Sequence, residues 1–139
     1  MTETDETLTR LDAAGGLPEV LAVAWDAFSV LQAGCRDGLG RSAELFAAFA
    51  FAAAAAAEGR LLLDSAPSLP AGQGAVTGAV PAVDADPGRL ADDLAGLARA
   101  LGARLGAAAR DAGDGGDRDA CGEAAVKAAR VGELLARDG

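Results

Sequence analysis

The sequence predicts an all-α protein, a single-domain four-helix bundle in up-down-up-down order. Four segments carry apolar residues at the three- and four-residue spacing of an amphipathic helix, and no segment alternates apolar and polar residues for long enough to form a strand. Six consecutive alanines, Ala52–Ala57, give the strongest helical signal in the chain. With 139 residues, the chain is long enough to bury one core.

Residues 1–16 are predicted to form a flexible acidic N-terminal segment. The segment carries four acidic side chains and ends in Gly15-Gly16. Leu8 and Leu11 would support one or two helical turns, which is the alternative.

The first predicted helix covers residues 17–37. Pro18 suits its first turn, where an N–H would lack a partner in any case. The expected packing seam consists of Leu17, Leu21, Ala24, Phe28, Leu31 and Cys35. Because the link that follows is short, this helix and the next should be antiparallel neighbours.

The second predicted helix covers residues 42–66, with Ser42 as its N-cap and Pro67 preventing its continuation. Apolar side chains surround nearly its whole circumference. A helix of this kind is normally buried, so we expect it to be the central helix around which the others pack.

Residues 67–86 are predicted to form a long Pro/Gly-rich loop between the second and third helices. A connection this long is either mobile or a crossover that runs the length of the bundle. If the loop is not a crossover, the helices follow the up-down-up-down order.

The third and fourth helices are predicted over residues 87–112 and 118–138. Asp86-Pro87 is an N-cap followed by a proline at the first helical position. The inward stripe of the third helix is Leu90, Leu94, Leu97, Leu101 and Leu105, and that of the fourth is Cys121, Ala124, Ala125, Ala128, Val131 and Leu135. Asp117 or Asp119 should cap the fourth helix, and Lys127 should pair with Glu123 one turn earlier.

Several classes of function are excluded by composition. The chain contains no histidine and no tyrosine, which removes the usual general base and the usual metal ligand. The aspartates between residues 111 and 119 do not match a calcium-binding loop and are interpreted as capping and turn residues. We therefore expect no catalytic residues, no cofactor, no metal site and no enzymatic activity. A net charge of −9 argues against binding to nucleic acid or to an anionic membrane surface.

The sequence also predicts where in the cell the protein is found. The N-terminus lacks the basic start and apolar core of a signal peptide. The uncharged run of the second helix, residues 45–57, is shorter than the roughly twenty residues that a membrane span needs. We expect no membrane insertion and a cytoplasmic protein.

The two cysteines bear on topology. In the up-down-up-down order the first and fourth helices are neighbours, so Cys35 and Cys121 should lie near the same end of the bundle as unpaired thiols. If the long loop is a crossover, they should lie far apart.

The candidate interaction surface consists of apolar residues outside the main stripes: Trp25, Phe51, Leu62, Val23 and Val30. Exposed together, they would exceed the apolar patch that soluble monomers usually tolerate. We expect a protein–protein interaction module that forms a homodimer or binds another protein. In one alternative the 67–86 loop covers these residues and the protein is a monomer. In another, the protein binds a small apolar ligand between its helices.

Overall fold

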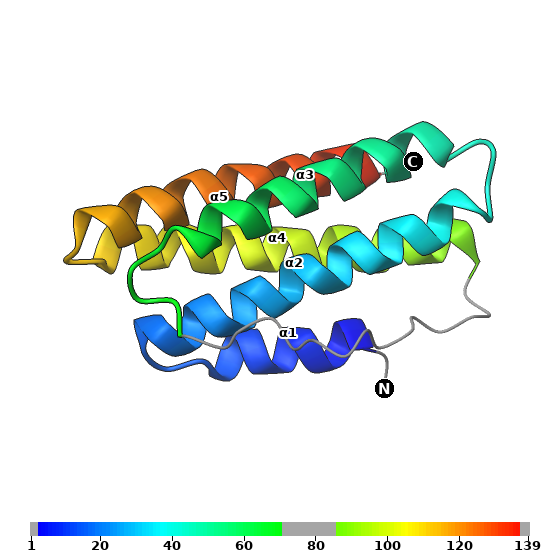
Figure 1. Cartoon of the computed structure of the whole chain (residues 1–139). Helices are drawn as coiled ribbons and strands as arrows, with labels where there is room; N and C mark the ends of the chain where they lie inside the picture. Colours follow the sequence, from blue (N-terminus) through cyan, green and yellow to red (C-terminus); the bar gives the residue numbers. More distant parts are fainter. Residues whose placement is uncertain (1–2, 71–85, 137–139) are drawn as a thin grey trace.

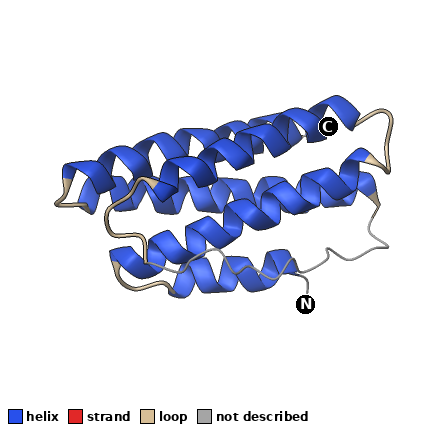
Figure 2. Cartoon of the chain, viewed as in Figure 1, coloured by secondary structure: helices blue, strands red, loops and turns tan. Residues whose placement is uncertain are grey.

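The computed structural model describes residues 3–70 and 86–136, in which helix is the only regular secondary structure (Figure 2). Five helices occur in these residues: α1 (Glu3–Ala13), α2 (Leu17–Leu39), α3 (Phe46–Asp64), α4 (Pro87–Asp111) and α5 (Gly115–Leu135). The all-α prediction is confirmed. The last four helices correspond to the four predicted ones, and α1 is a fifth.

The helices pack side by side with their axes roughly aligned (Figure 1). Helix α2 contacts α3 and α4, and α5 contacts the same two helices, so that α2, α3, α5 and α4 make a closed ring of contacts. Helix α1 packs outside this ring, against α2 and α4. As a result, α3 and α1 lie on opposite sides of the molecule, at the top and the bottom of Figure 1.

The predicted up-down-up-down order is wrong. Helices α3 and α4 run in the same direction, and α2 and α5 both run in the opposite direction (Figure 1). The end of α3 and the start of α4 therefore lie at opposite ends of the molecule, as in the crossover alternative. The chain from Pro70 to Asp86 can span this length, because sixteen steps at about 3.3 Å reach roughly 50 Å. Of the predicted loop, residues 71–85 lie outside the described residues, so the prediction of its mobility stays a prediction.

The predicted flexible segment contains the helix α1 instead. An isolated helix of 11 residues is marginal in water, so contacts with the rest of the fold must stabilise it. The Leu11 side chain is buried against the core, Arg10 forms a 2.9 Å ion pair with Asp26 of α2, and Arg104 of α4 donates to the carbonyl oxygen of Ala14. Packing thus outweighs the polar composition that suggested disorder.

The most buried helix is α2, and the expectation that residues 42–66 form the central helix is wrong. Helix α2 contacts α1, α3 and α4, so it buries residues on nearly every side, among them Val23 and Trp25. Helix α3 packs chiefly against α2 and α5 and leaves its remaining side uncovered. Its most apolar stretch of 18 residues is only 33% buried.

Glycines allow the closest approaches between α2 and its neighbours. A Cβ atom at Gly34 would lie 2.9 Å from the Leu94 side chain, and one at Gly38 would lie 2.6 Å from the Phe49 ring. Both distances are below van der Waals contact. These glycines therefore let large buried side chains of α4 and α3 lie directly against the α2 backbone.

Most helix ends agree with the sequence. The Asp86 carboxylate accepts a hydrogen bond from the Arg89 N–H and caps α4, as predicted. Ser42 accepts a 3.1 Å hydrogen bond from the Leu45 N–H, yet regular helix begins only at Phe46. Asp114 caps α5, whereas Asp117 or Asp119 was expected. The residues of the predicted inward stripes are buried, except that Leu17 and Ala125 are only partly buried.

Candidate interaction surface

The five residues of the predicted interaction surface do not form one exposed patch. Phe51 is exposed, with 64% of its surface accessible. Val30 and Leu62 are partly buried and pack against the core, while Val23 and Trp25 are buried within it. The reason is that α2 has three neighbouring helices, and residues outside its main seam meet α1 or α3 rather than water.

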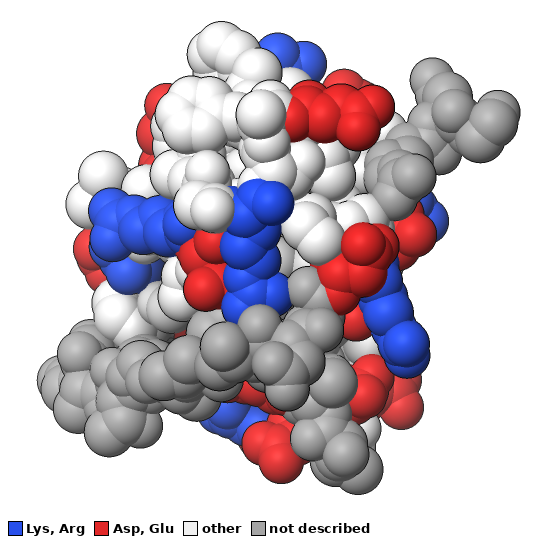
Figure 3. All heavy atoms as spheres, turned by 90° about the vertical axis from the view of Figure 1, so that its right-hand side faces the viewer, with Lys and Arg blue, Asp and Glu red and all other residues white. Residues whose placement is uncertain are grey.

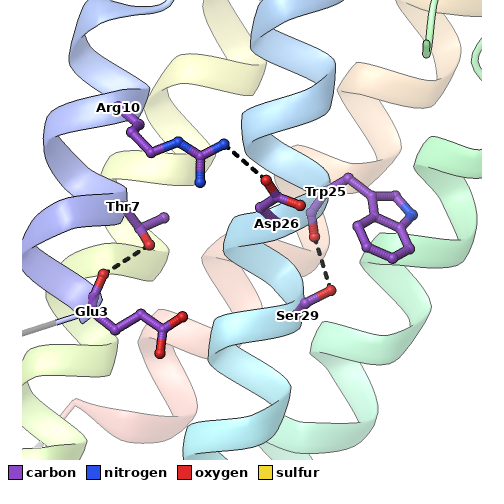
Figure 4. A network of polar contacts seen from close by, with 6 residues as sticks. All are labelled: Glu3, Thr7, Arg10, Trp25, Asp26 and Ser29. Carbon is purple, nitrogen blue, oxygen red and sulfur yellow. Dashed lines mark hydrogen bonds and ion pairs between the residues drawn. The ribbon is translucent and has the colours of Figure 1, made fainter. Parts of the chain in front are cut away.

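Trp25 has its own partners on α3. Figure 4 shows its indole directed toward α3, away from Asp26, which faces Arg10 of α1. The indole Nε1–H donates a 2.9 Å hydrogen bond to Asp64 Oδ1, and the Arg60 guanidinium lies 5.3 Å from the ring centroid. These contacts satisfy the polar atom of a tryptophan that is 9% exposed. Trp25 therefore fixes α3 against α2 and offers little surface to a partner.

A different apolar surface lies on the side of α3 that faces water. Its exposed residues follow a regular four-three spacing: Ala47, Phe51, Ala54, Glu58 and Leu61. We call these five residues the outer face of α3. Phe51 and Leu61 are each 64% exposed, and Phe46, beside this face at the start of the helix, is 53% exposed. Figure 3 shows uncharged side chains gathered toward the top of this end of the molecule, where α3 begins, with charged side chains around them.

The sequence contained part of this signal. Phe51 was identified from its position outside the main stripe, but Leu61 and Phe46 were not. Leu61 belongs to the row Ala47–Ala54–Leu61 at a spacing of seven residues, which a search for a second helical seam would have found. The number of helices that surround each helix could not be predicted from the sequence.

The edge of this surface toward α5 is polar. Lys127 Nζ lies 2.6 Å from Glu58 Oε2 of α3, and no ion pair with the predicted Glu123 is found among the described residues. Both side chains are substantially exposed, so the pair contributes at most about 1 kcal/mol. On α5, Val126 is 67% exposed.

Helix α3 also meets the length and composition criteria for a membrane span. Three charged residues lie in its second half: Glu58, Arg60 and Asp64. All three contact neighbouring helices, Glu58 through Lys127 and the other two through Trp25. Through these contacts, one side of α3 is packed against α2 and α5.

The cysteines lie in protein surroundings that favour the protonated thiol. Burial raises the pKa of Cys35 to about 12. Burial, together with the nearby Asp117 carboxylate, raises the pKa of Cys121. A thiol with a raised pKa is a poor nucleophile. The two residues lie at opposite ends of the molecule, near the end of α2 and the start of α5, so the prediction that they lie close together is wrong (Figure 1).

Asp117 is a buried carboxylate with a structural role. It accepts hydrogen bonds from the Ser68 backbone N–H at 2.9 Å and from the Ser68 hydroxyl at 2.6 Å. These bonds tie the chain after α3 to the first turn of α5. Within the described residues, no group of three or more His, Cys, Asp or Glu side chains could hold a metal ion.

No protein-family model, curated protein or solved structure was found to match this chain.

Proposed function

We propose that this chain is a protein–protein interaction module, a four-helix bundle with α1 added to it, and that it self-associates through the outer face of α3. The observation that supports this proposal is the exposure of Phe51 and Leu61 on the most apolar helix of the protein. Burying a side chain of this size fully stabilises a complex by about 1.5–3 kcal/mol relative to leaving it in water. The outer side of a surface helix is typically lined by charged and polar residues.

The spacing of the outer face favours another helix as the occupant. Residues that alternate at four and three positions form a seam that packs along a partner helix. A second copy of α3 supplies the same seam, and a two-fold axis makes the two surfaces self-complementary. Ala54 lies near the middle of the seam, where its small side chain allows the two helices to approach closely.

Charge favours antiparallel pairing of the two copies. In a parallel pair the two Glu58 carboxylates would lie side by side. In an antiparallel pair with its axis at Ala54, they are separated by about 12 Å along the helices, from eight residues at 1.5 Å each. At that distance the repulsion is largely screened at physiological ionic strength, and each Glu58 keeps its own Lys127 partner.

Sedimentation equilibrium over micromolar concentrations tests the proposal. We expect the wild type to be a dimer and the double variant Phe51→Ser/Leu61→Ser to dissociate at least about 100-fold more readily, because four exposed apolar side chains leave the interface. Val126→Ser is the matched control: it removes an equally exposed apolar residue from α5 and should leave the dimer unchanged. Unchanged helical circular dichroism verifies folding of each variant.

Two results contradict the proposal. One is a monomeric wild type across the concentration range; binding of that monomer to neutral phospholipid vesicles would then identify a membrane as the occupant of α3. The other is a dimer that survives the double substitution, which would place the interface elsewhere. Trp25→Ala is unsuitable for this experiment, because it removes a buried side chain and unpairs Asp64.

A further inference from the structure

The side of the molecule opposite α3 has two hollows that share one basic side chain, Arg104 of α4. The larger has a volume of about 360 Å³ and lies between α1 and α4, lined by Leu8, Leu11, Ala103 and Ala107 among others. The smaller, of about 180 Å³, lies beside the turn between α1 and α2. Arg104 lines both. The larger volume is at the lower end of the range typical of small-molecule sites.

Arg104 is only partly satisfied in this position. One Nη–H donates to the Ala14 carbonyl oxygen, while the Nε atom is buried without a hydrogen-bond partner. Among the described residues no carboxylate forms an ion pair with its guanidinium. Arg104 as a whole is half-buried, and its buried N–H without a partner carries a free-energy cost.

The larger hollow combines this cation with an apolar lining. Leu8, Leu11, Ala103 and Ala107 offer hydrocarbon surface, and Asp12 is the one acidic residue in the lining. Asp12 is exposed to solvent, so water and salt screen its repulsion of an anion. A guanidinium binds a carboxylate through two parallel N–H···O bonds, which in the side-on arrangement come from Nε and one Nη.

We infer that the hollow between α1 and α4 binds a small organic carboxylate with a short hydrocarbon tail. Arg104 holds the carboxylate, turning on binding so that its Nε–H and one Nη–H face the ligand. Leu8 and Leu11 of α1 and the alanines of α4 cover the tail. The site is separate from the proposed interface on α3, which lies on the other side of the molecule (Figure 1).

Calorimetric titration with octanoate tests this inference. We expect one octanoate per chain and a raised melting temperature, with at least tenfold weaker binding of octanamide, which has the tail without the charge. Acetate, which lacks the tail, should not bind measurably. The Phe51→Ser/Leu61→Ser variant should bind octanoate as the wild type does, because the hollow lies away from α3. Octanoate binding is therefore tested separately from dimer formation.

Two variants assign the roles of the lining. Arg104→Met keeps an apolar side chain of similar length and should weaken octanoate binding at least tenfold. Arg99→Met is its matched control, because Arg99 is exposed on the same helix, where it faces Gly132 of α5. Ala107→Leu fills the hollow and should abolish binding while Arg104 is still present. Melting curves verify that each variant is folded.

Three outcomes would overturn the inference. The first is no binding of octanoate at millimolar concentration. The second is equal binding of octanoate and octanamide, which would make the hollow an apolar site without a role for charge. The third is undiminished binding by folded Arg104→Met, which would show that Arg104 serves only to hold the Ala14 carbonyl.

Discussion

At the scale of the residue, Gly59 shows how a missing Cβ atom sets the distance between α2 and α3. A Cβ atom at this position would lie 2.5 Å from Cζ of Phe28, whose ring is fully buried. Tightly packed interiors leave such a ring no free volume into which it could move. The contact therefore depends on glycine although it lies within a helix, where glycine is intrinsically unfavourable.

We predict that Gly59→Ala lowers the free energy of unfolding by about 1–3 kcal/mol, because the added methyl group overpacks the core at Phe28. Gly96→Ala is the control. A Cβ atom at Gly96 meets nothing within 4 Å, so this substitution should stabilise α4 by up to about 1 kcal/mol. Urea unfolding measures both changes. A Gly59→Ala protein as stable as the wild type would show that α2 and α3 are not in the close contact described.

Trp25 illustrates at the same scale why exposure is hard to infer from one helix. On a helical wheel it lies among polar residues, which suggested an exposed side chain. Its partners Asp64 and Arg60 lie on α3, about forty residues along the chain. The wheel of a single helix therefore does not show whether a side chain faces solvent or a neighbouring helix.

At the scale of the element, α1 is stabilised by the helices it contacts. The segment has few apolar residues, but Leu11 is buried and Leu8 packs beside it. The acidic residues Glu3, Asp5 and Glu6 lie in the first turn, where they interact favourably with the helix dipole. A short helix with one well-buried side chain can thus belong to the core.

We predict that Leu11→Ala destabilises the protein by about 2–5 kcal/mol, the range for removing a buried leucine side chain. Arg10→Ala should cost less than about 1 kcal/mol, because its ion pair with Asp26 is partly exposed. Thermal unfolding of both variants gives the comparison. If residues 1–16 were a flexible segment, Leu11→Ala would leave the unfolding transition unchanged.

At the scale of the whole molecule, the decisive feature is the direction of α4. Because α4 starts at the end opposite to that where α3 stops, every pair of neighbours within the ring α2–α3–α5–α4 is antiparallel and the diagonal pairs are parallel (Figure 1). The hydrogen bonds between Asp117 and Ser68 join the end of α3 to the start of α5 and agree with this arrangement.

We predict a separation of about 30 Å between spin labels at Ser65→Cys and Asp86→Cys in a Cys35→Ala/Cys121→Ala background. The 19 residues of α3 at 1.5 Å each account for this length. Labels at Ser65→Cys and Gly115→Cys, which lie at the same end of the molecule, are the control and should be much closer. Pulsed dipolar spectroscopy measures both. A Ser65–Asp86 distance near 10 Å, the spacing of adjacent helices, would restore the up-down-up-down order.

The all-α class, the approximate limits of the four long helices and most of their inward stripes could be predicted from the sequence. These are local properties, set by helix propensity, by the spacing of apolar residues and by caps such as Asp86. Phe51 was found in the same way, as an apolar residue outside the stripe of its own helix.

The identity of the neighbouring helices could be read from the folded structure but not from the sequence. The fold packed α2 against α1, α3 and α4, buried more of that helix than of any other, and left the more apolar α3 exposed along one side. It also buried Trp25 and Val23, ordered α1, separated the cysteines and put Arg104 between two hollows. The physical reason is that burial depends on the number and position of neighbouring helices. These follow from the path of the connection between α3 and α4, which local pattern does not specify.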